Sequence, residues 1–176
     1  MNMKRLSVML FLLFPALLMA QGNKADARGY IVKVGEQAPA DFKLVLHNGE
    51  TTSLAQLKGK VVVLQFTASW CVVCREEMPH LEKEVWQAYK DKGLVLIGVD
   101  RDEPLPVVQK FAKDMKISYP LALDPGADIF GRFADKKSGV TRNIVIDRQG
   151  KIVYLTRLYD EKEFKGMLAA IGQLLK

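Results

Sequence analysis

The chain has 176 residues, of which 49% are hydrophobic and 26% are charged, as expected of one globular domain with its own core. Its formal net charge is +6. The first twenty residues contribute two of the positive charges, and the remaining basic residues are scattered, which argues against a nucleic-acid-binding protein.

A short apolar segment opens the chain. Lys4 and Arg5 precede an apolar run over residues 6–20. This pattern is typical of a secretory signal peptide, and the run is shorter than the roughly 17–25 residues of a membrane-spanning helix. We expect a signal peptide over residues 1–20, cut there or as late as residue 27. The expected location is the periplasm or cell envelope, with membrane contact only through an uncleaved leader.

Residues 21–34 are polar and mixed, and they predict a flexible lead-in to a domain over residues 35–176. That domain begins with two short extended segments, 41–46 and 50–53, around His47-Asn48-Gly49. An Asn-Gly pair between extended segments predicts a β-hairpin.

Strands and helices then alternate along the chain. Residues 61–66 are almost continuously apolar, as in a strand buried on both faces. Apolar residues at helical spacing follow over residues 72–92, and Gly93 ends that helix. The remaining predicted elements are a strand (94–99), a helix (105–115), a short helix (127–133), two strands (143–147 and 151–155) and a closing helix (161–175). This order predicts an α/β fold with a mixed sheet covered on both faces.

The two cysteines, Cys71 and Cys74, are three residues apart. A bridge between them closes almost no loop and adds little stability, so a chemical role is expected. Cys71 falls at the first turn of a helix that follows a buried strand, where free N–H groups and the helix dipole lower a thiol pKa. We expect Cys71 to be the nucleophile. Cys74, one turn later on the same face, is expected to resolve the mixed disulfide.

The cysteine pair has two alternative interpretations. A zinc site needs two more ligands at suitable spacing, and the histidines, His47 and His80, form no second cluster. A purely structural buried pair is the other alternative. The strand–turn–helix context favours redox chemistry.

The segment Phe66-Thr-Ala-Ser-Trp-Cys-Val-Val-Cys74, with Pro79 beyond it, resembles the active-site segment of the thioredoxin superfamily. The segments Val34-Gly-Glu-Gln-Ala-Pro39, Leu57-Lys-Gly-Lys-Val61 and Ile146-Asp-Arg-Gln-Gly-Lys-Ile152 resemble its TlpA/ResA-like branch of exported thiol–disulfide oxidoreductases. The resemblance implies a three-layer thioredoxin-like fold with the N-terminal β-hairpin added. It also implies a redox-active disulfide with no other cofactor and no metal. The implied partners are disulfide-containing exported proteins and an electron-donor protein.

Carried over residue by residue, the resemblance makes Cys71 the exposed nucleophile and Cys74 the resolving thiol. Trp70 corresponds to the tryptophan beside the disulfide, with an ordinary core aromatic as the alternative. Glu77 falls where related members carry a glutamate near the thiols, and a carboxylate there could exchange protons with them. An exposed glutamate in a charged stretch is the alternative.

The chain departs from the family pattern in the positions that support the disulfide. Thr141 stands where a cis-proline usually faces the disulfide, so we expect a trans 140–141 peptide and a differently shaped docking backbone. We expect docking or supporting roles for Trp70, Thr141, Arg142 and Pro79. Gln65 replaces a buried aspartate and cannot take up a proton, which gives Glu77 or water a larger part in activating Cys74.

The residues between the cysteines indicate a direction of reaction. Val72 and Val73 offer no charge or side-chain donor to stabilise a thiolate, which favours a reductase of protein disulfides over an oxidase. Two alternatives remain. A thiol peroxidase would use Thr141 and Arg142 to orient peroxide, although the usual Pro-Thr-Cys signature is absent. A copper-binding thiol chaperone would need a later histidine, and none follows His80.

Overall fold

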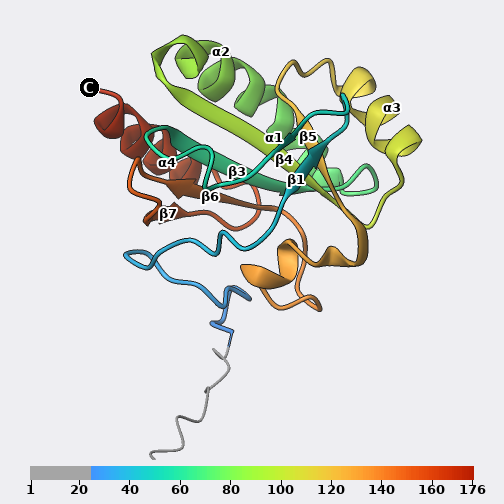
Figure 1. Cartoon of the computed structure of the whole chain (residues 1–176), viewed down its shortest axis with the longest axis horizontal. Coiled ribbons are helices and arrows are strands. Elements are labelled where there is room, and N and C mark those ends of the chain that lie inside the picture. The colour runs from blue at the N-terminus through green and yellow to red at the C-terminus, as the bar shows by residue number, and fades with distance from the viewer. Residues whose placement is uncertain (1–24) are drawn as a thin grey trace, which may run out of the picture.

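The structure is a computed structural model that describes residues 25–176 (Figure 1). The predicted signal peptide lies outside the described residues. Within residues 25–176, no helix combines the length and apolar character needed to cross a membrane.

A mixed seven-stranded sheet forms the middle of the molecule, in the order β2-β1-β5-β4-β3-β6-β7. The central strands β3, β4 and β5 are parallel, and the outer pairs are antiparallel. The strands are β1 (Leu44–Leu46), β2 (Thr51–Thr52), β3 (Val61–Thr67), β4 (Leu94–Arg101), β5 (Leu121–Asp124), β6 (Arg142–Ile146) and β7 (Ile152–Leu155). The strand β5 is not among the predicted elements, because its four residues show no period of their own.

The helical segments follow the predicted ranges with changes in winding. The range 72–92 is one helical stretch built from α1 (Val72–His80), the π-helical η1 (Leu81–Trp86), α2 (Gln87–Tyr89) and the 3-10 helix η2 (Lys90–Lys92). Gly93 ends it in the left-handed region, with φ 90°. The other α-helices are α3 (Leu105–Met115) and α4 (Glu161–Leu174). A short helix was predicted over 127–133, and two 3-10 helices, η3 (Pro125–Ala127) and η4 (Phe130–Arg132), occupy that region.

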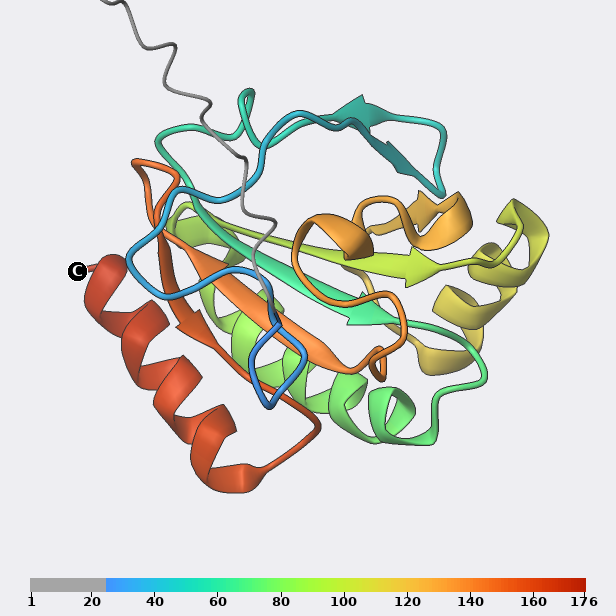
Figure 2. The same ribbon diagram turned by 90° about the horizontal axis from the view of Figure 1, so that it is seen from below.

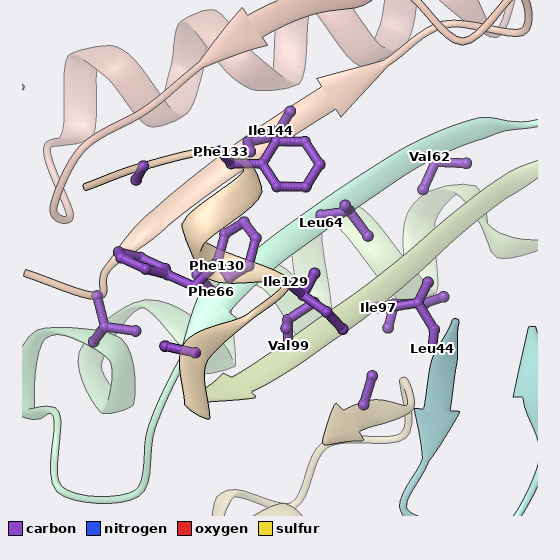
Figure 3. Close-up of a cluster of buried hydrophobic side chains, with 14 of the residues drawn as sticks. Leu44, Val62, Leu64, Phe66, Ile97, Val99, Ile129, Phe130, Phe133 and Ile144 are labelled. Atoms are coloured by element: carbon purple, nitrogen blue, oxygen red, sulfur yellow. The ribbon is translucent and has the colours of Figure 1, made fainter. Parts of the chain in front are cut away.

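The two faces of the sheet are covered differently (Figures 1 and 2). The α-helices α1, α3 and α4 pack on one face with Val61, Val63 and Val145 of the sheet. The 3-10 helices η3 and η4 and the N-terminal segment cover the other face, where Val62, Leu64 and Phe66 point. Figure 3 shows this second cluster, with Phe130 and Phe133 beside Phe66. The arrangement is the predicted three-layer α/β fold, with its reactive edge where β3 leads into α1.

Residues 25–34 differ from the flexible lead-in that the sequence suggested. Tyr30 is buried, pairs through its main chain with Ala134, and donates a hydrogen bond from its hydroxyl to the carbonyl of Thr156. Val32 is buried in the same cluster. These side chains pack into the apolar cluster on this face of the sheet, so this segment belongs to the folded domain.

Candidate active site

A disulfide joins Cys71 and Cys74 at the start of α1, with a Cα–Cα distance of 5.3 Å. Cys71 caps the helix, and its Sγ accepts a hydrogen bond of 3.2 Å from the backbone N–H of Cys74. Cys71 retains 8% exposure and Cys74 has none. The capping position places a Cys71 thiolate at the positive end of the helix, and a partner can reach only this cysteine.

Thr141 lies directly against the disulfide. Its hydroxyl oxygen is 3.1 Å from Sγ of Cys71 and 3.2 Å from Sγ of Cys74. The 140–141 peptide is trans, as expected, because residues 25–176 contain no cis peptide bond. The carbonyl of Thr141 accepts hydrogen bonds from the N–H of Leu158 at 3.1 Å and from Nη1 of Arg157 at 3.3 Å. The Thr141 side chain therefore touches both sulfurs of the disulfide.

Glu77 is buried one turn beyond Cys74, with 1% exposure, so the alternative of an exposed glutamate is wrong. Its Oε1 accepts a 2.6 Å hydrogen bond from Nδ2 of Asn143. Burial raises the pKa of Glu77 to about 7, and the amides of Asn143 and Gln65 partly oppose that rise. A carboxyl group with this pKa can take up and release a proton near neutral pH.

A buried polar network surrounds Glu77. Gln65 on β3 is buried and accepts a 2.8 Å hydrogen bond from the hydroxyl of Tyr119. Asn143 on β6 donates a second hydrogen bond, 2.9 Å long, to Oγ1 of Thr156. The sequence pattern does not predict Asn143, Thr156 or Tyr119 as residues of the site. An asparagine within an apolar strand was the available signal, because strand alternation puts Asn143 on the face that α1 covers.

The loop before Cys71 is held by an acidic side chain that the sequence analysis also missed. Ser69 donates to Glu103 twice, from its backbone N–H at 2.5 Å and from its hydroxyl at 2.6 Å. Asp100, at the end of β4, is buried beside this contact. Burial, followed by the negative charges of Glu103 and Asp124, raises the pKa of Asp100 to about 8.

The structure places the remaining predicted residues in three different settings. Trp70 is 62% exposed next to Cys71, so the core-aromatic alternative is wrong. Pro79 is exposed on α1, just before the π-helical turn. Arg142 is buried on the opposite face of β6 from Asn143, where Nη2 donates to the Ser138 hydroxyl and the Gly139 carbonyl.

Arg142 is thus fixed away from the sulfurs by its surroundings. Its guanidinium lies over the rings of Tyr30 and Phe130, with centroid distances of 4.6 and 5.1 Å. Burial lowers its pKa to about 10. Among the residues that the structure describes, no hydrogen bond joins Arg142 to either cysteine, so its neighbourhood in sequence to Thr141 does not make it a thiol ligand.

Comparison with known proteins identifies the family of this chain. The AhpC/TSA family matches over residues 34–155. The thiol–disulfide oxidoreductase ResA of Bacillus cereus is 35% identical over 133 residues, which cover 76% of this chain and 73% of that protein. The chain belongs to the AhpC/TSA family and is a TlpA/ResA-like member of the thioredoxin superfamily.

Solved structures of thiol–disulfide proteins share the fold of this chain. The solution structure of a protein proposed to be a protein disulfide isomerase, from Bacteroides thetaiotaomicron, is 55% identical, with a TM-score of 0.81 over 84% of this chain and 92% of that one. The thioredoxin domain of a thiol–disulfide oxidoreductase from Bacteroides vulgatus is 26% identical, with a TM-score of 0.69 over 82% of this chain and 99% of that one. The TlpA/ResA-like chain is thus a thiol–disulfide oxidoreductase that acts by dithiol–disulfide exchange on protein substrates and redox partners.

The two histidines of this TlpA/ResA-like chain contact residues other than the cysteines. His80 pairs with Glu84 at 2.9 Å and stacks on Tyr159, and His47 contacts the backbone of Leu121. Within residues 25–176, no group of three or more His, Cys, Asp or Glu side chains is placed to hold a metal ion.

Proposed function

We propose that this chain reduces disulfides in exported proteins, with Cys71 as the nucleophile, Cys74 as the resolving thiol and no cofactor besides the disulfide they form. The observation that carries the proposal is the Cys71–Cys74 disulfide at the N-terminus of α1, accessible only at Cys71. The basic and apolar start of the chain supports export.

Each exchange moves two electrons. The Cys71 thiolate attacks one sulfur of the partner's disulfide, forming a mixed disulfide, and the partner's other sulfur leaves as a thiolate. The Cys74 thiolate then attacks Sγ of Cys71, restores the Cys71–Cys74 disulfide and expels the partner's second sulfur. The partner is reduced and this chain is oxidised. A dithiol donor protein, acting in the reverse sense, returns the chain to its reduced form.

Glu77 has the proton chemistry that the second attack needs. Cys74 has no exposure, so water has poor access to its thiol. Glu77 lies three residues further along α1, and its pKa of about 7 suits it to accept the thiol proton when Cys74 becomes a thiolate. Gln65 cannot ionise, so Glu77 is the nearby group of this network that can store that proton.

Trapping of mixed disulfides on Cys71 tests the proposal. A Cys74→Ala variant, expressed with its leader, is expected to accumulate mixed disulfides between Cys71 and exported proteins, visible on non-reducing gels and released by dithiothreitol. The matched Cys71→Ala variant should accumulate none. Equal, negligible trapping by both variants would contradict the proposed exchange. N-terminal sequencing of the protein recovered from the cell envelope tests export, with cleavage expected after residue 20 or as late as residue 27.

A thiol peroxidase is the second candidate, favoured by the match to the AhpC/TSA family and by the hydroxyl of Thr141 on Cys71. Arg142, which would orient peroxide in such a site, is instead enclosed by Tyr30 and Phe130. Rapid consumption of hydrogen peroxide by the reduced protein, lost in Cys71→Ala, would favour this candidate over the reductase.

A further inference from the structure

The hydroxyl of Thr141 occupies a position that can serve both cysteines. It is buried and lies 3.1 Å from one sulfur and 3.2 Å from the other. Neither sulfur of a disulfide carries a hydrogen, so the Thr141 hydroxyl is the only donor available in either contact, and its single hydrogen can point to one sulfur at a time. We propose that the Thr141 hydroxyl is a catalytic hydrogen-bond donor that stabilises the thiolate of Cys71 in the first attack and that of Cys74 in the second. This inference rests on the proposed exchange reaction.

Few other donors reach the sulfurs. Within the part of the chain that the structure describes, Sγ of Cys71 accepts hydrogen bonds from the Cys74 N–H and from Thr141. Sγ of Cys74 has Thr141 as its one hydrogen-bonding partner. Val72 and Val73 carry no donor in their side chains. Thr141 therefore provides the side-chain donor that the residues between the cysteines lack.

The position of Thr141 is fixed by contacts that do not involve the sulfurs. Its carbonyl is held by the Leu158 N–H and by the guanidinium of Arg157. Two residues earlier, the carbonyl of Gly139 accepts a 2.7 Å hydrogen bond from Arg142. A donor that is already in place stabilises a developing charge without first reorganising, which makes it more effective than a mobile group.

The nearly equal distances allow one hydroxyl to follow the charge. In the first attack the negative charge starts on Cys71, and in the second it starts on Cys74. Rotation about the Cβ–Oγ1 bond of Thr141 redirects its hydrogen from one sulfur to the other, with no backbone movement. A hydrogen bond to a charged group of this kind lowers a thiol pKa by roughly 1–2 units.

Several charged groups surround the thiols and stay unchanged when Thr141 is replaced. Glu77 follows Cys74 on α1, Arg75 bonds the Ser69 carbonyl, and Glu103 reaches the same loop from beyond β4. Arg157 contacts Thr141 from the segment after β7. A change in a cysteine pKa on removal of the hydroxyl alone therefore reports the Thr141 hydrogen bond.

Single-cysteine proteins test the inference directly. In a Cys74→Ser background, the ultraviolet absorbance of the Cys71 thiolate is titrated with Thr141, Thr141→Val and Thr141→Ser. Valine keeps the shape without the hydroxyl, and serine keeps the hydroxyl. We expect Thr141→Val to raise the Cys71 pKa by about 1 unit and Thr141→Ser to return it toward the value with threonine. In a Cys71→Ser background, Thr141→Val should raise the Cys74 pKa at least as much, and Thr141→Ser should again return it toward the value with threonine.

The two-cysteine proteins give a second measurement, the equilibrium with glutathione. Loss of thiolate stabilisation should favour the disulfide of Thr141→Val by roughly tenfold, which corresponds to a reduction potential about 30 mV lower than in the wild type. Thr141→Ala provides a second hydroxyl-free variant if valine impairs folding, judged by near-ultraviolet circular dichroism. Unchanged thiol pKa values in the folded hydroxyl-free variant would overturn the inference, even with a wild type active in disulfide exchange. An inactive wild type would instead overturn the proposed function.

Discussion

Nδ2 of Asn143 donates a 2.6 Å hydrogen bond to Oε1 of Glu77 inside the domain. The other carboxyl oxygen, Oε2, has no hydrogen-bond partner among residues 25–176. Only half of an ionised Glu77 would therefore be compensated, and the cost of burying its charge dominates. This is why the pKa of Glu77 rises to about 7 although an amide is bonded to it.

The raised pKa predicts how Glu77 affects stability. Between about pH 4.5 and pH 7 the folded protein keeps a proton on Glu77 that the unfolded chain has released. The folded state then binds more protons, so the free energy of unfolding falls as pH rises through this range, by about 3 kcal/mol in total. Glu77→Gln removes this contribution. Denaturant unfolding should show the variant gaining stability over the wild type from pH 4.5 to pH 7.5, with the difference level above that.

Glu76→Gln is the matched control, because Glu76 is the exposed neighbour on the same helix. Its stability difference from the wild type should stay flat across the same range. A flat profile for Glu77→Gln as well would mean that the carboxyl ionises normally despite its burial.

Glu77 also predicts a kinetic effect on the second exchange step. If Glu77 accepts the Cys74 proton, the resolution rate of a preformed mixed disulfide should rise with pH around an apparent pKa near 7. Glu77→Gln should slow resolution at pH 7 by roughly 10²-fold and remove that inflection. The rate is measured by stopped-flow as the release of a chromogenic thiol from Cys71. The control variant Glu76→Gln should resolve the mixed disulfide at the wild-type rate. A retained inflection in Glu77→Gln would assign it to Cys74 itself.

The network around Glu77 also shows what sequence reasoning could reach. The strand–turn–helix context predicted the setting of the cysteines, and apolar periodicity predicted the approximate ranges of α1, α3 and α4. Both could be predicted because periodicity and spacing are local properties of the chain. Burial of Glu77 could not be read from its charged neighbours, since it depends on Asn143 from a strand 66 residues later in the sequence. The strand β5 was missed because its identity comes from pairing with β1 and β4 rather than from its own pattern. Tyr30 was assigned to a loose segment because its partners are likewise distant.

Tyr30 predicts a measurable contribution of residues 25–34 to stability. Its hydroxyl supplies a hydrogen bond to the buried carbonyl of Thr156, and its ring lies against the Arg142 guanidinium. Tyr30→Phe should lower the free energy of unfolding by about 1–3 kcal/mol, and Tyr30→Ala by about 3–5 kcal/mol. Tyr89→Phe serves as the control, since the hydroxyl of Tyr89 donates no hydrogen bond within residues 25–176 and should cost little. Equal effects of Tyr30→Phe and Tyr89→Phe would indicate that the hydroxyl contact contributes nothing.

Asp100 predicts a second pH dependence, over a wider range than that of Glu77 and independent of the cysteines. Its buried carboxyl lies near Glu103 and Asp124, and burial together with these like charges raises its pKa from 3.8 to about 8. The folded protein therefore holds a proton that the unfolded chain loses near pH 4, and stability falls as pH rises toward 8. The amide introduced by Asp100→Asn cannot ionise, so the variant lacks this dependence on pH. Denaturant unfolding should thus show Asp100→Asn gaining stability over the wild type progressively up to pH 8–9.

The control for Asp100→Asn is the same substitution at an exposed site, Asp91→Asn, which should show no such gain. A stability gain that is constant with pH would show that Asp100 is already ionised in the folded protein.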